Sequence, residues 1–401
     1  MLVRAESPLY DEAIRLLRSL SGSHGIRASS EKTANYGAVF TRDAVMAGVA
    51  GLLIEDATIT EGLVRTLEHL RELQGPEGQV PSNYELLAGQ PTRVSFGSLV
   101  PRIDAATWYL IGVAMGARAG VLDATHFRNS VGVVVRLLAA MEYNGRHLIY
   151  VPPGGNWADE YPYEGYVLYD QVLRAWALRM LASTYNEPLW GEKASLIERT
   201  IEINYWPTPE SEQRDGRFHL PSVRALIDPD RVHPVASFSP VGSWNILDLA
   251  ACSLLAVSGI APALGSASLN WIVERFLVRS ELPPAFHPVI DEAHPSWPAL
   301  SQYFLYEFRN RPHEYHNGGI WPIWVGWLAL GIARSGRTAA LAQLREVVQL
   351  RLGNLTDFRF EEYLNGKTGL PGGTTGMAYS ATGIVFLHVA TSDNRLRLFS
   401  T

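Results

Sequence analysis

The sequence of 401 residues predicts an all-α protein folded as an (α/α)6 barrel, a closed ring of six helical hairpins. Two observations carry this prediction. Apolar residues recur three and four positions apart along most of the chain, whereas strand-like alternation is scarce. Short links within helix pairs also alternate with long links rich in glycine, proline and aromatic residues. This alternation predicts that the long links gather at one end of the barrel, where a rigid scaffold commonly carries binding residues.

Twelve segments have helical spacing, with boundaries that sequence patterns define only to within a few residues. They run near 8–20, 41–54, 58–74, 103–119, 124–142, 165–184, 188–204, 243–257, 264–279, 320–334, 338–353 and 375–390. Capping and turn residues mark several boundaries, such as Asp123 before the fifth segment and Gly336 between the tenth and the eleventh. The best strand candidate is HLIYVP at 147–152, which we expect to form a short hairpin strand.

No low-complexity linker interrupts the chain, so we expect a single domain over residues 1–401. An open helical solenoid is the structural alternative. A solenoid should show a sequence repeat of fixed period, and we find none. The closed ring is therefore the preferred prediction.

Composition limits the classes of partner. The chain is 47% hydrophobic and 18% charged, its net charge is −6, and it has no run of basic residues, which argues against nucleic acid as a partner. The longest apolar stretches, such as 44–54, are too short to span a bilayer, so we expect no membrane partner. The one cysteine, Cys252, lies in an apolar run and cannot form an internal disulfide, and the N-terminus lacks the pattern of a signal peptide. We therefore expect a cytoplasmic protein, and exposed aromatic residues would permit a homo-oligomer.

The long links share a composition that is typical of sugar-binding sites. Aromatic rings can stack on the apolar faces of a sugar, while carboxylates and amides bind its hydroxyls. A simpler interpretation, that the aromatic residues only plug the barrel ends, fits any single link about equally well. Five links of the same character favour the sugar interpretation: VPSNYE (80–85), GGNWADEYPYEGY (154–166), NYWPTPE (204–210), HEYHNGGIWP (313–322) and FRFEEYLNGKTG (358–369).

Two helix starts carry candidate sugar-binding residues. Arg42 and Asp43 begin the second predicted helix, where an Arg–Asp pair at a barrel mouth can hold two hydroxyls of one ring. Asp104 and Trp108 repeat the theme in the fourth helix. The alternative for both aspartates is a purely structural role as caps at the helix N-terminus.

Glycoside hydrolysis needs two carboxyl groups that face one bond, and these must come from different links. Asp159 and Glu160 supply one side, and Glu361 and Glu362 supply the other. Burial beside Trp157 would raise the pKa of a neighbouring carboxyl group, as a proton donor requires. The residues alone do not choose within either pair, and solvated loop acids remain the alternative.

Other chemistries fit the sequence less well. The histidines show no metal-binding spacing, and with one cysteine we expect no metal site. Glycine-rich nucleotide loops and the nucleophile elbow of serine hydrolases are also absent from the sequence, so we expect no cofactor.

Three motifs, NYGAVFTRD (35–43), HNGGIWPIW (316–324) and EEYLNGKTG (361–369), resemble those of the alkaline/neutral invertases. The resemblance covers about residues 35 to 390. It implies an (α/α)6 barrel and a glycoside hydrolase that inverts the configuration at the anomeric carbon. More distantly, NWADEY resembles the acid-bearing loop of amylo-α-1,6-glucosidases, which share the barrel.

The resemblance also implies roles for individual residues. Asp159 matches the general acid and Glu362 the general base, while Arg42 and Asp43 match the pair that holds the terminal sugar. Asp104, Trp108, His316, Asn317 and Trp321 match positions that line the sugar pocket. We also expect Trp157 and Tyr379 to bind the substrate. Three departures from the family pattern fall near the pocket, namely Ala105-Ala106 after Asp104, Val167-Leu168-Tyr169 after the acid loop, and Met377 in place of a glutamine.

The resulting prediction is an inverting hydrolase of a small α-glucoside, with sucrose as the leading substrate. An amylo-α-1,6-glucosidase-like enzyme or another α-glucosidase, such as a glucosylglycerate hydrolase, is the alternative. A more remote one is an N-acyl-sugar epimerase that uses His313 and His316, or a sugar-binding protein without catalysis. Inversion predicts that the two catalytic carboxyl groups lie about 6.5–9.5 Å apart.

Overall fold

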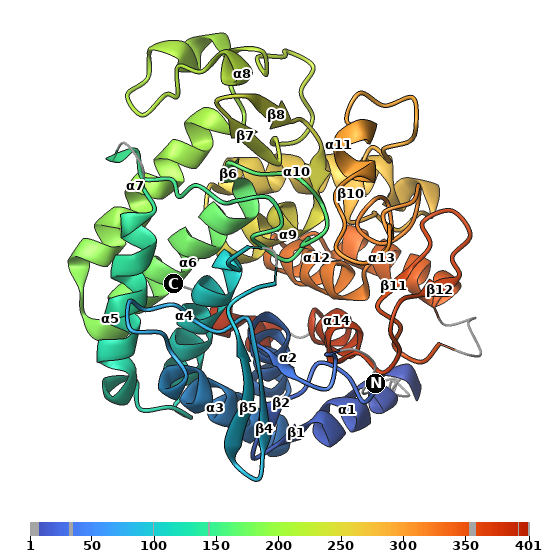
Figure 1. Ribbon diagram of the computed structural model, residues 1–401. Helices are drawn as coiled ribbons and strands as arrows, with labels where there is room; N and C mark the ends of the chain where they lie inside the picture. The colour runs from blue at the N-terminus through green and yellow to red at the C-terminus, as the bar shows by residue number, and fades with distance from the viewer. Residues whose placement is uncertain are drawn as a thin grey trace.

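The computed structural model describes residues 8–31, 35–98, 100–142, 145–352, 358–391 and 393–399, and it confirms the (α/α)6 barrel. Each helix of an inner ring contacts the next, and the last contacts the first, so the ring is closed (Figure 1). The inner ring consists of α2 (Thr41–Ile54), α4 (Ile103–Arg118), α6 (Leu168–Tyr185), α9 (Leu249–Ser258), α12 (Pro322–Arg334) and α14 (Ala378–Val389).

An outer helix packs on each inner helix. The outer helices are α3 (Ala57–Glu72), α5 (Ala124–Ala140), α7 (Pro188–Asn204), α10 (Pro262–Arg275), α13 (Thr338–Arg351) and α1 (Pro8–Leu20). The first five follow their inner partners directly, whereas α1 packs on α14 (Figure 1). The sixth hairpin is therefore formed by the two ends of the chain. All twelve predicted helices are present.

Patterns of burial explain which helices are inner and which are outer. In α4, every residue from Ile103 to Gly116 is buried, whereas α3 buries residues at positions 59, 62, 63, 66, 67 and 70, which form one face. Small residues let the inner helices approach closely. A Cβ atom on Gly326 of α12 would lie 2.5 Å from the carbonyl oxygen of Gly383 in α14, so this crossing requires glycine.

Short elements complete the barrel. They are α8 (Pro221–Arg224), α11 (Trp297–Ser301) and the 3-10 helices η2 (Pro209–Gln213), η3 (Leu277–Arg279) and η4 (Asp393–Phe399). The last of these, η4, packs against the inner helices α2, α4 and α12. Arg118 of α4 donates a hydrogen bond to the carbonyl of Leu398, and Arg334 of α12 donates one to that of Leu396. The barrel is therefore closed at this end.

Short antiparallel strands lie in the links. The sheets are β1–β2 (Ser21–Gly22, Gly25–Ile26), β3–β4–β5 (Val39–Phe40, Asn83–Leu87, Gln90–Ser95), β6–β7–β8 (Tyr166–Val167, Ser237–Ser239, Gly242–Trp244), β9–β10 (Leu247–Asp248, Phe286–His287) and β11–β12 (Tyr363–Leu364, Pro371–Gly372). The strand predicted over 147–152 is wrong, because this segment makes only one isolated bridge, from Val151 to Gly165. The helix predicted from residue 243 begins at Leu249, since β8 and β9 occupy the preceding residues.

The β4–β5 hairpin was not predicted. Its two-residue turn consists of Ala88 and Gly89, both with positive φ (50° and 79°), as a tight hairpin turn requires. Alanine rarely adopts this conformation, so the sequence gives only a weak turn signal.

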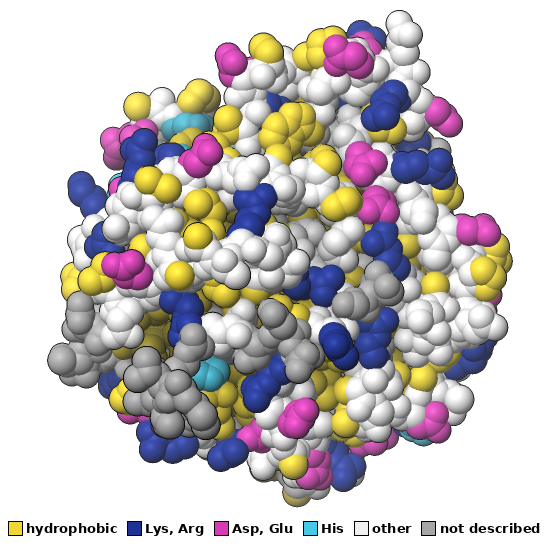
Figure 2. All heavy atoms as spheres, turned by 180° about the vertical axis from the view of Figure 1, so that it is seen from behind, with side chains coloured by type: hydrophobic (Ala, Val, Ile, Leu, Met, Phe, Trp, Pro, Cys, Tyr) yellow, Lys and Arg dark blue, Asp and Glu magenta, His cyan; other side chains and the backbone are white. Residues whose placement is uncertain are grey.

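Basic and acidic side chains are both spread over the face seen in Figure 2. Within the described ranges, no helix has the length and apolar character needed to cross a membrane. Cys252 is buried inside α9, where burial raises the pKa of its thiol to about 12.

Candidate active site

The first turns or preceding links of five inner helices, α2, α4, α6, α12 and α14, line a cavity of about 610 Å³. The cavity brings together seven of the eleven predicted site residues: Arg42, Asp43, Trp157, Asp159, Trp321, Glu362 and Tyr379. These residues come from separate stretches of the sequence. The prediction that the long links gather at one end is therefore confirmed for this part of the site.

The loop that carries Asp159 is held by its own backbone. Gly154 has a φ of 68°, and a Cβ atom there would lie 2.5 Å from the carbonyl oxygen of Asp159. The side chain of Asn156 accepts a hydrogen bond from the backbone N–H of Ala158 at 3.1 Å. Asp159 itself is 35% exposed, and its Oδ2 accepts a hydrogen bond from Arg102 Nη2 at 3.1 Å. This carboxylate therefore lies on the open side of the cavity.

Glu160, the neighbour of Asp159, is held firmly. Arg309 donates from Nε to one carboxylate oxygen at 3.1 Å and lies 3.0 Å from the other through Nη2, a two-pronged arrangement. Asn310 also donates to the backbone carbonyl of Glu160. Because both carboxylate oxygens face Arg309, Glu160 is suited to anchoring the loop.

Glu362, which lines the same cavity, lies just before β11 and is only 5% exposed. The hydroxyl of Tyr36 donates to its Oε1 at 2.9 Å. Burial raises the pKa of Glu362, while the Arg309 guanidinium and the Tyr36 hydrogen bond act in the opposite direction. Its neighbour Glu361 does not line the cavity, and its carboxylate accepts the backbone N–H of Arg359.

Three residues that line the cavity carry buried polar atoms without a hydrogen-bond partner in the described part of the chain. Within the described residues, Trp157 Nε1, Tyr379 OH and Asp43 Oδ1 are buried and have no hydrogen-bond partner. Arg42 forms an ion pair with Asp104 at 2.8 Å and lies 3.5 Å from Asp43. Burial raises the pKa of Asp43 to about 6 against the effect of Arg42. Buried polar atoms without partners are uncommon in proteins, so this set fits a site that hydrogen-bonds a polar ligand.

Four predicted residues do not line the cavity. Asp104 faces an adjoining side pocket of about 80 Å³. Trp108 lies one helical turn deeper, where its indole donates to Tyr169 OH and its ring packs against Trp327. His316 lies behind Trp321, with the two rings stacked at 5.3 Å.

Asn317 is the fourth. Its side-chain amide donates to the carbonyls of Ile290 and Asn310 and accepts the N–H of Ile290. The donors and the acceptor of this amide are thus used to hold the loops together.

Sequence reasoning missed several lining residues, among them Tyr36, Arg309 and Tyr315. Tyr36 lies inside the NYGAVFTRD motif, which could have indicated it. Arg309 lies in a link without a recognisable motif, and its guanidinium lies 4.0 Å from the ring centroid of Tyr315. Its contact with Glu160, 149 residues away in the chain, is visible only in the folded structure.

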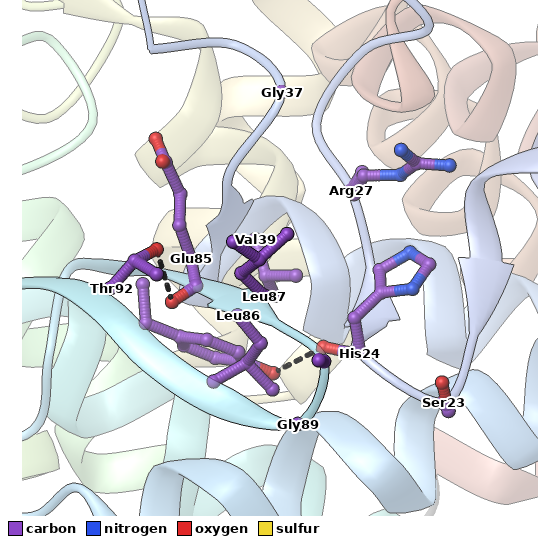
Figure 3. Close-up of a pocket in the computed structure, with 12 residues that line it drawn as sticks. Ser23, His24, Arg27, Gly37, Val39, Glu85, Leu86, Leu87, Gly89 and Thr92 are labelled. Atoms are coloured by element: carbon purple, nitrogen blue, oxygen red, sulfur yellow. Dashed lines mark hydrogen bonds between the residues drawn. The ribbon is translucent and has the colours of Figure 1, made fainter.

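A second cavity, of about 720 Å³, lies between the β1–β2 turn and the β4–β5 hairpin (Figure 3). It is lined by His24 and Arg27 on one side and by Leu86 and Leu87 on the other. Among the described residues that line it, Glu85 is the one carboxylate. Because glycoside hydrolysis needs two carboxyl groups, this larger cavity does not fit the chemistry. Among the described residues, no cluster of three His, Cys, Asp or Glu side chains is arranged to hold a metal ion.

The comparisons with known proteins agree with this geometry. The family model described as alkaline and neutral invertase matches residues 291–392, which is 102 of the 401 residues. The match includes HNGGIWPIW and EEYLNGKTG, so the resemblance to these invertases is confirmed over this part of the chain. No curated protein matches the sequence.

Solved structures match over nearly the whole chain. The GH63 mannosylglycerate hydrolase from Thermus thermophilus in complex with glucose has a TM-score of 0.64 at 14% identity, covering 95% of this chain and 99% of that one. The same hydrolase with Tris and D-glycerate also reaches 0.64, at 15% identity, covering 94% and 99%. A bacterial glucoamylase complexed with acarbose has a TM-score of 0.61 at 15% identity, covering 98% of this chain and 56% of that one.

At these identities the structural likeness establishes the fold, which is the six-hairpin barrel of these glycosidases. The family match, over residues 291–392, is to the alkaline and neutral invertases, which are glycoside hydrolases. Together they identify the chain as a glycoside hydrolase, as the sequence predicts.

Proposed function

We propose that the protein is an inverting exo-glycosidase of a small α-glucoside, with sucrose as the leading substrate, and that residues 1–401 act as one catalytic domain. The observation that carries this proposal is that Asp159 and Glu362, from two separate loops, line the same cavity. The lining residues Trp157, Tyr379 and Asp43, an aromatic, a hydroxyl and a carboxylate group, are of the types that bind a sugar ring.

In the proposed reaction, Asp159 donates its proton to the glycosidic oxygen as the bond to the anomeric carbon breaks. Glu362 removes a proton from a water molecule that attacks the opposite face of that carbon. The products are glucose of inverted configuration and the free alcohol. Glu362 ends protonated and Asp159 ends ionised, so one proton must return to Asp159 through solvent.

The surroundings of the two carboxylates differ in solvent access and in charge. Burial raises the pKa of Glu362, which makes its ionised form a stronger base towards water. Asp159 is more exposed, on the side where a leaving group can depart. Because Asp159 is paired with Arg102, it must exchange this partner for a proton before it acts as an acid.

Burial of Glu362 and the ion pair of Asp159 with Arg102 support a competing assignment. In that assignment Glu362 is the acid and Asp159 is the base. α-Glucosyl fluoride separates the two, because fluoride leaves with little help from an acid. We expect Asp159→Asn to retain most of its activity on this substrate while losing activity on sucrose, and Glu362→Gln to lose activity on both. The reverse pattern would support the competing assignment.

A glucoside of a small hydroxy acid is a second candidate substrate, because of Arg102. Its side chain is 11% exposed, and within the described residues its Nη1 atom is buried without a partner. Once Asp159 is protonated, Arg102 loses its counter-charge, and a buried unpaired cation is costly. A carboxylate on the leaving group would replace it, and the mannosylglycerate hydrolase of the same fold binds D-glycerate.

Kinetics on sucrose and on glucosylglycerate distinguish the two candidates. A higher kcat/KM for glucosylglycerate, lost in Arg102→Gln, would favour the hydroxy acid. An epimerase is less well supported, since neither His313 nor His316 lines the cavity. A cytoplasmic location stays a prediction from the sequence.

A further inference from the structure

We propose that the segment from Tyr303 to Arg309 forms the wall of a leaving-group subsite, with Tyr306 as the stacking platform for a ring-shaped sugar. This inference rests on the proposed function and adds the class of leaving group to it. The segment, called the rim strap below, lies between α11 and α12 and contributes Leu305, Tyr306 and Glu307 to the lining of the active-site cavity.

The rim strap is fastened at both ends to the segment before β6 that carries Asp159 (residues 152–165), called the acid loop. The hydroxyl of Tyr303 donates to the carbonyl of Pro153 at 2.7 Å. At the other end, Arg309 binds the carboxylate of Glu160 through two nitrogens. The residues between these anchors span the rim of the cavity, and three of them line it, which leaves their side chains available to a ligand.

This connection determines which end of the substrate the rim strap meets. Asp159 lies between the anchor points Pro153 and Glu160 on the acid loop. A proton donor must touch the glycosidic oxygen, and that oxygen leaves with the departing group. Because the rim strap is tied to the loop that carries the donor, it adjoins the departing group, whereas the water activated by Glu362 attacks from the other face.

Tyr306 is unusually exposed for an aromatic residue beside a catalytic cavity. It is 87% exposed, and yet it lines the cavity. Elsewhere in the cavity the aromatic residues Trp157, Trp321 and Tyr379 are buried. An open aromatic face at the rim suits stacking against the C–H face of a sugar ring.

Polar groups complete the proposed subsite. Arg93 of β5 and Ser98 line the same cavity from the hairpin side, and Glu307 adjoins Tyr306. They provide donors and an acceptor for the hydroxyls of a ring. A three-carbon hydroxy acid has no ring face to stack. A stacking role for Tyr306 therefore favours a departing group with a sugar ring, such as fructose or glucose.

The test uses two kinds of substrate that share the glucosyl group and differ in the departing group. Sucrose, trehalose, isomaltose and maltose place a sugar ring against the rim strap, whereas α-glucosyl fluoride places only fluoride there. We expect Tyr306→Ala to lower kcat/KM for the best disaccharide by roughly tenfold, mainly through KM. The same variant should keep kcat/KM for α-glucosyl fluoride within about twofold of the wild type, because no ring is stacked there.

Two further variants serve as controls. Tyr306→Phe keeps the ring and should restore disaccharide kinetics close to wild type. Leu87→Ala removes another exposed apolar side chain, at the tip of the β4–β5 hairpin outside this cavity, and should change neither substrate.

The outcomes separate this inference from the proposed function. If wild type cleaves α-glucosyl fluoride and a disaccharide, but Tyr306→Ala leaves disaccharide kinetics unchanged or impairs both substrates equally, the stacking platform is wrong and the hydrolase stands. A preference for glucosylglycerate that Tyr306→Ala leaves intact would likewise overturn the platform. Failure of wild type to cleave any of these glucosides would overturn the proposed function, and the platform with it.

Discussion

The acid loop and the segment before β11 each present two adjacent carboxylates, yet the two regions use them differently. On the acid loop, Asp159 is 35% exposed and pairs with Arg102, while Glu160 is tied to Arg309. Before β11, Glu362 is buried and receives the Tyr36 hydroxyl, while Glu361 binds the backbone. Glu160 lines the cavity together with Asp159, but its carboxylate is held by Arg309, whereas Glu361 does not line the cavity.

The difference lies in solvent access. The open side can accept departing groups of various sizes and lets Asp159 regain a proton from solvent. In the proposed mechanism, the closed side shields Glu362 and the attacking water, and burial there raises the pKa of Glu362. The contrast therefore fits a hydrolase in which the leaving group departs on one side and a confined water attacks from the other.

Removing either cavity-facing carboxylate should have the largest effect. We expect Glu362→Gln and Asp159→Asn each to lower kcat on sucrose by at least about a hundredfold, the scale of acid–base catalysis. Circular dichroism and melting curves should stay close to wild type. Glu77→Gln, which alters an exposed acid outside the cavity lining, is the matched control. Near-normal turnover in either catalytic variant would show that its assignment is wrong.

Two glycines, Gly154 beside Asp159 and Gly373 beside Glu362, allow the two carboxylates to be displaced separately. A Cβ at Gly154 would meet the carbonyl of Asp159 at 2.5 Å, and one at Gly373 would meet Glu362 Oε2 at 2.5 Å; both glycines have positive φ. We expect Gly154→Ala and Gly373→Ala each to lower kcat by roughly tenfold or more, because small displacements of catalytic groups are costly.

The substrate dependence of these variants sharpens the comparison. On α-glucosyl fluoride, which needs little acid assistance, Gly154→Ala should recover more activity than Gly373→Ala. Equal losses on both substrates would argue against separate acid and base sides. Gly89→Ala, at a positive-φ hairpin position with open space around its Cβ, controls for backbone strain alone.

The anchor of the acid loop should contribute to stability as well as to rate. Arg309→Gln leaves the buried Glu160 carboxylate without its cation, which we expect to lower the free energy of unfolding by about 2 kcal/mol. Arg309 also opposes the raised pKa of Glu362, so the variant should move the acid limb of the pH–rate profile to higher pH. Urea denaturation at neutral pH and the pH dependence of kcat/KM measure the two effects. An unchanged midpoint would show that the ion pair does not hold the loop.

The smallest expected effect is a shift in the pH dependence of kcat/KM when the hydrogen bond from Tyr36 to Glu362 is removed. A base works in its ionised form, so kcat/KM should fall as the pH drops through the pKa of Glu362, which burial raises above its ordinary value. The Tyr36 hydroxyl stabilises the ionised form, and Tyr36→Phe should therefore raise this pKa further. An acid limb that moves to lower pH, or does not move, would contradict this arrangement.

Sequence patterns were sufficient for the barrel but only partly for the site. Helical periodicity and link length are local properties, so they predicted the twelve helices and the loop-rich end. Asp104 and Trp108 show the limit, because residues four apart share a helix face but differ in depth by a full turn. Trp108 consequently lies in the core, against Trp327.

The contacts that bring the two sides together join residues far apart in the chain. Tyr36 reaches Glu362 across 326 positions, and Arg309 reaches Glu160 across 149. A single sequence contains no local pattern for such pairs. The same holds for Asn317, whose motif indicated a ligand contact, although its amide is engaged by the backbone of neighbouring loops.

Proton NMR of the first product formed from an α-glucoside such as sucrose tests the central claim most directly. Attack of water on the face opposite the departing group predicts that β-glucose accumulates first and then mutarotates to the equilibrium mixture. Initial accumulation of α-glucose would contradict an inverting mechanism that uses Asp159 as the acid and Glu362 as the base.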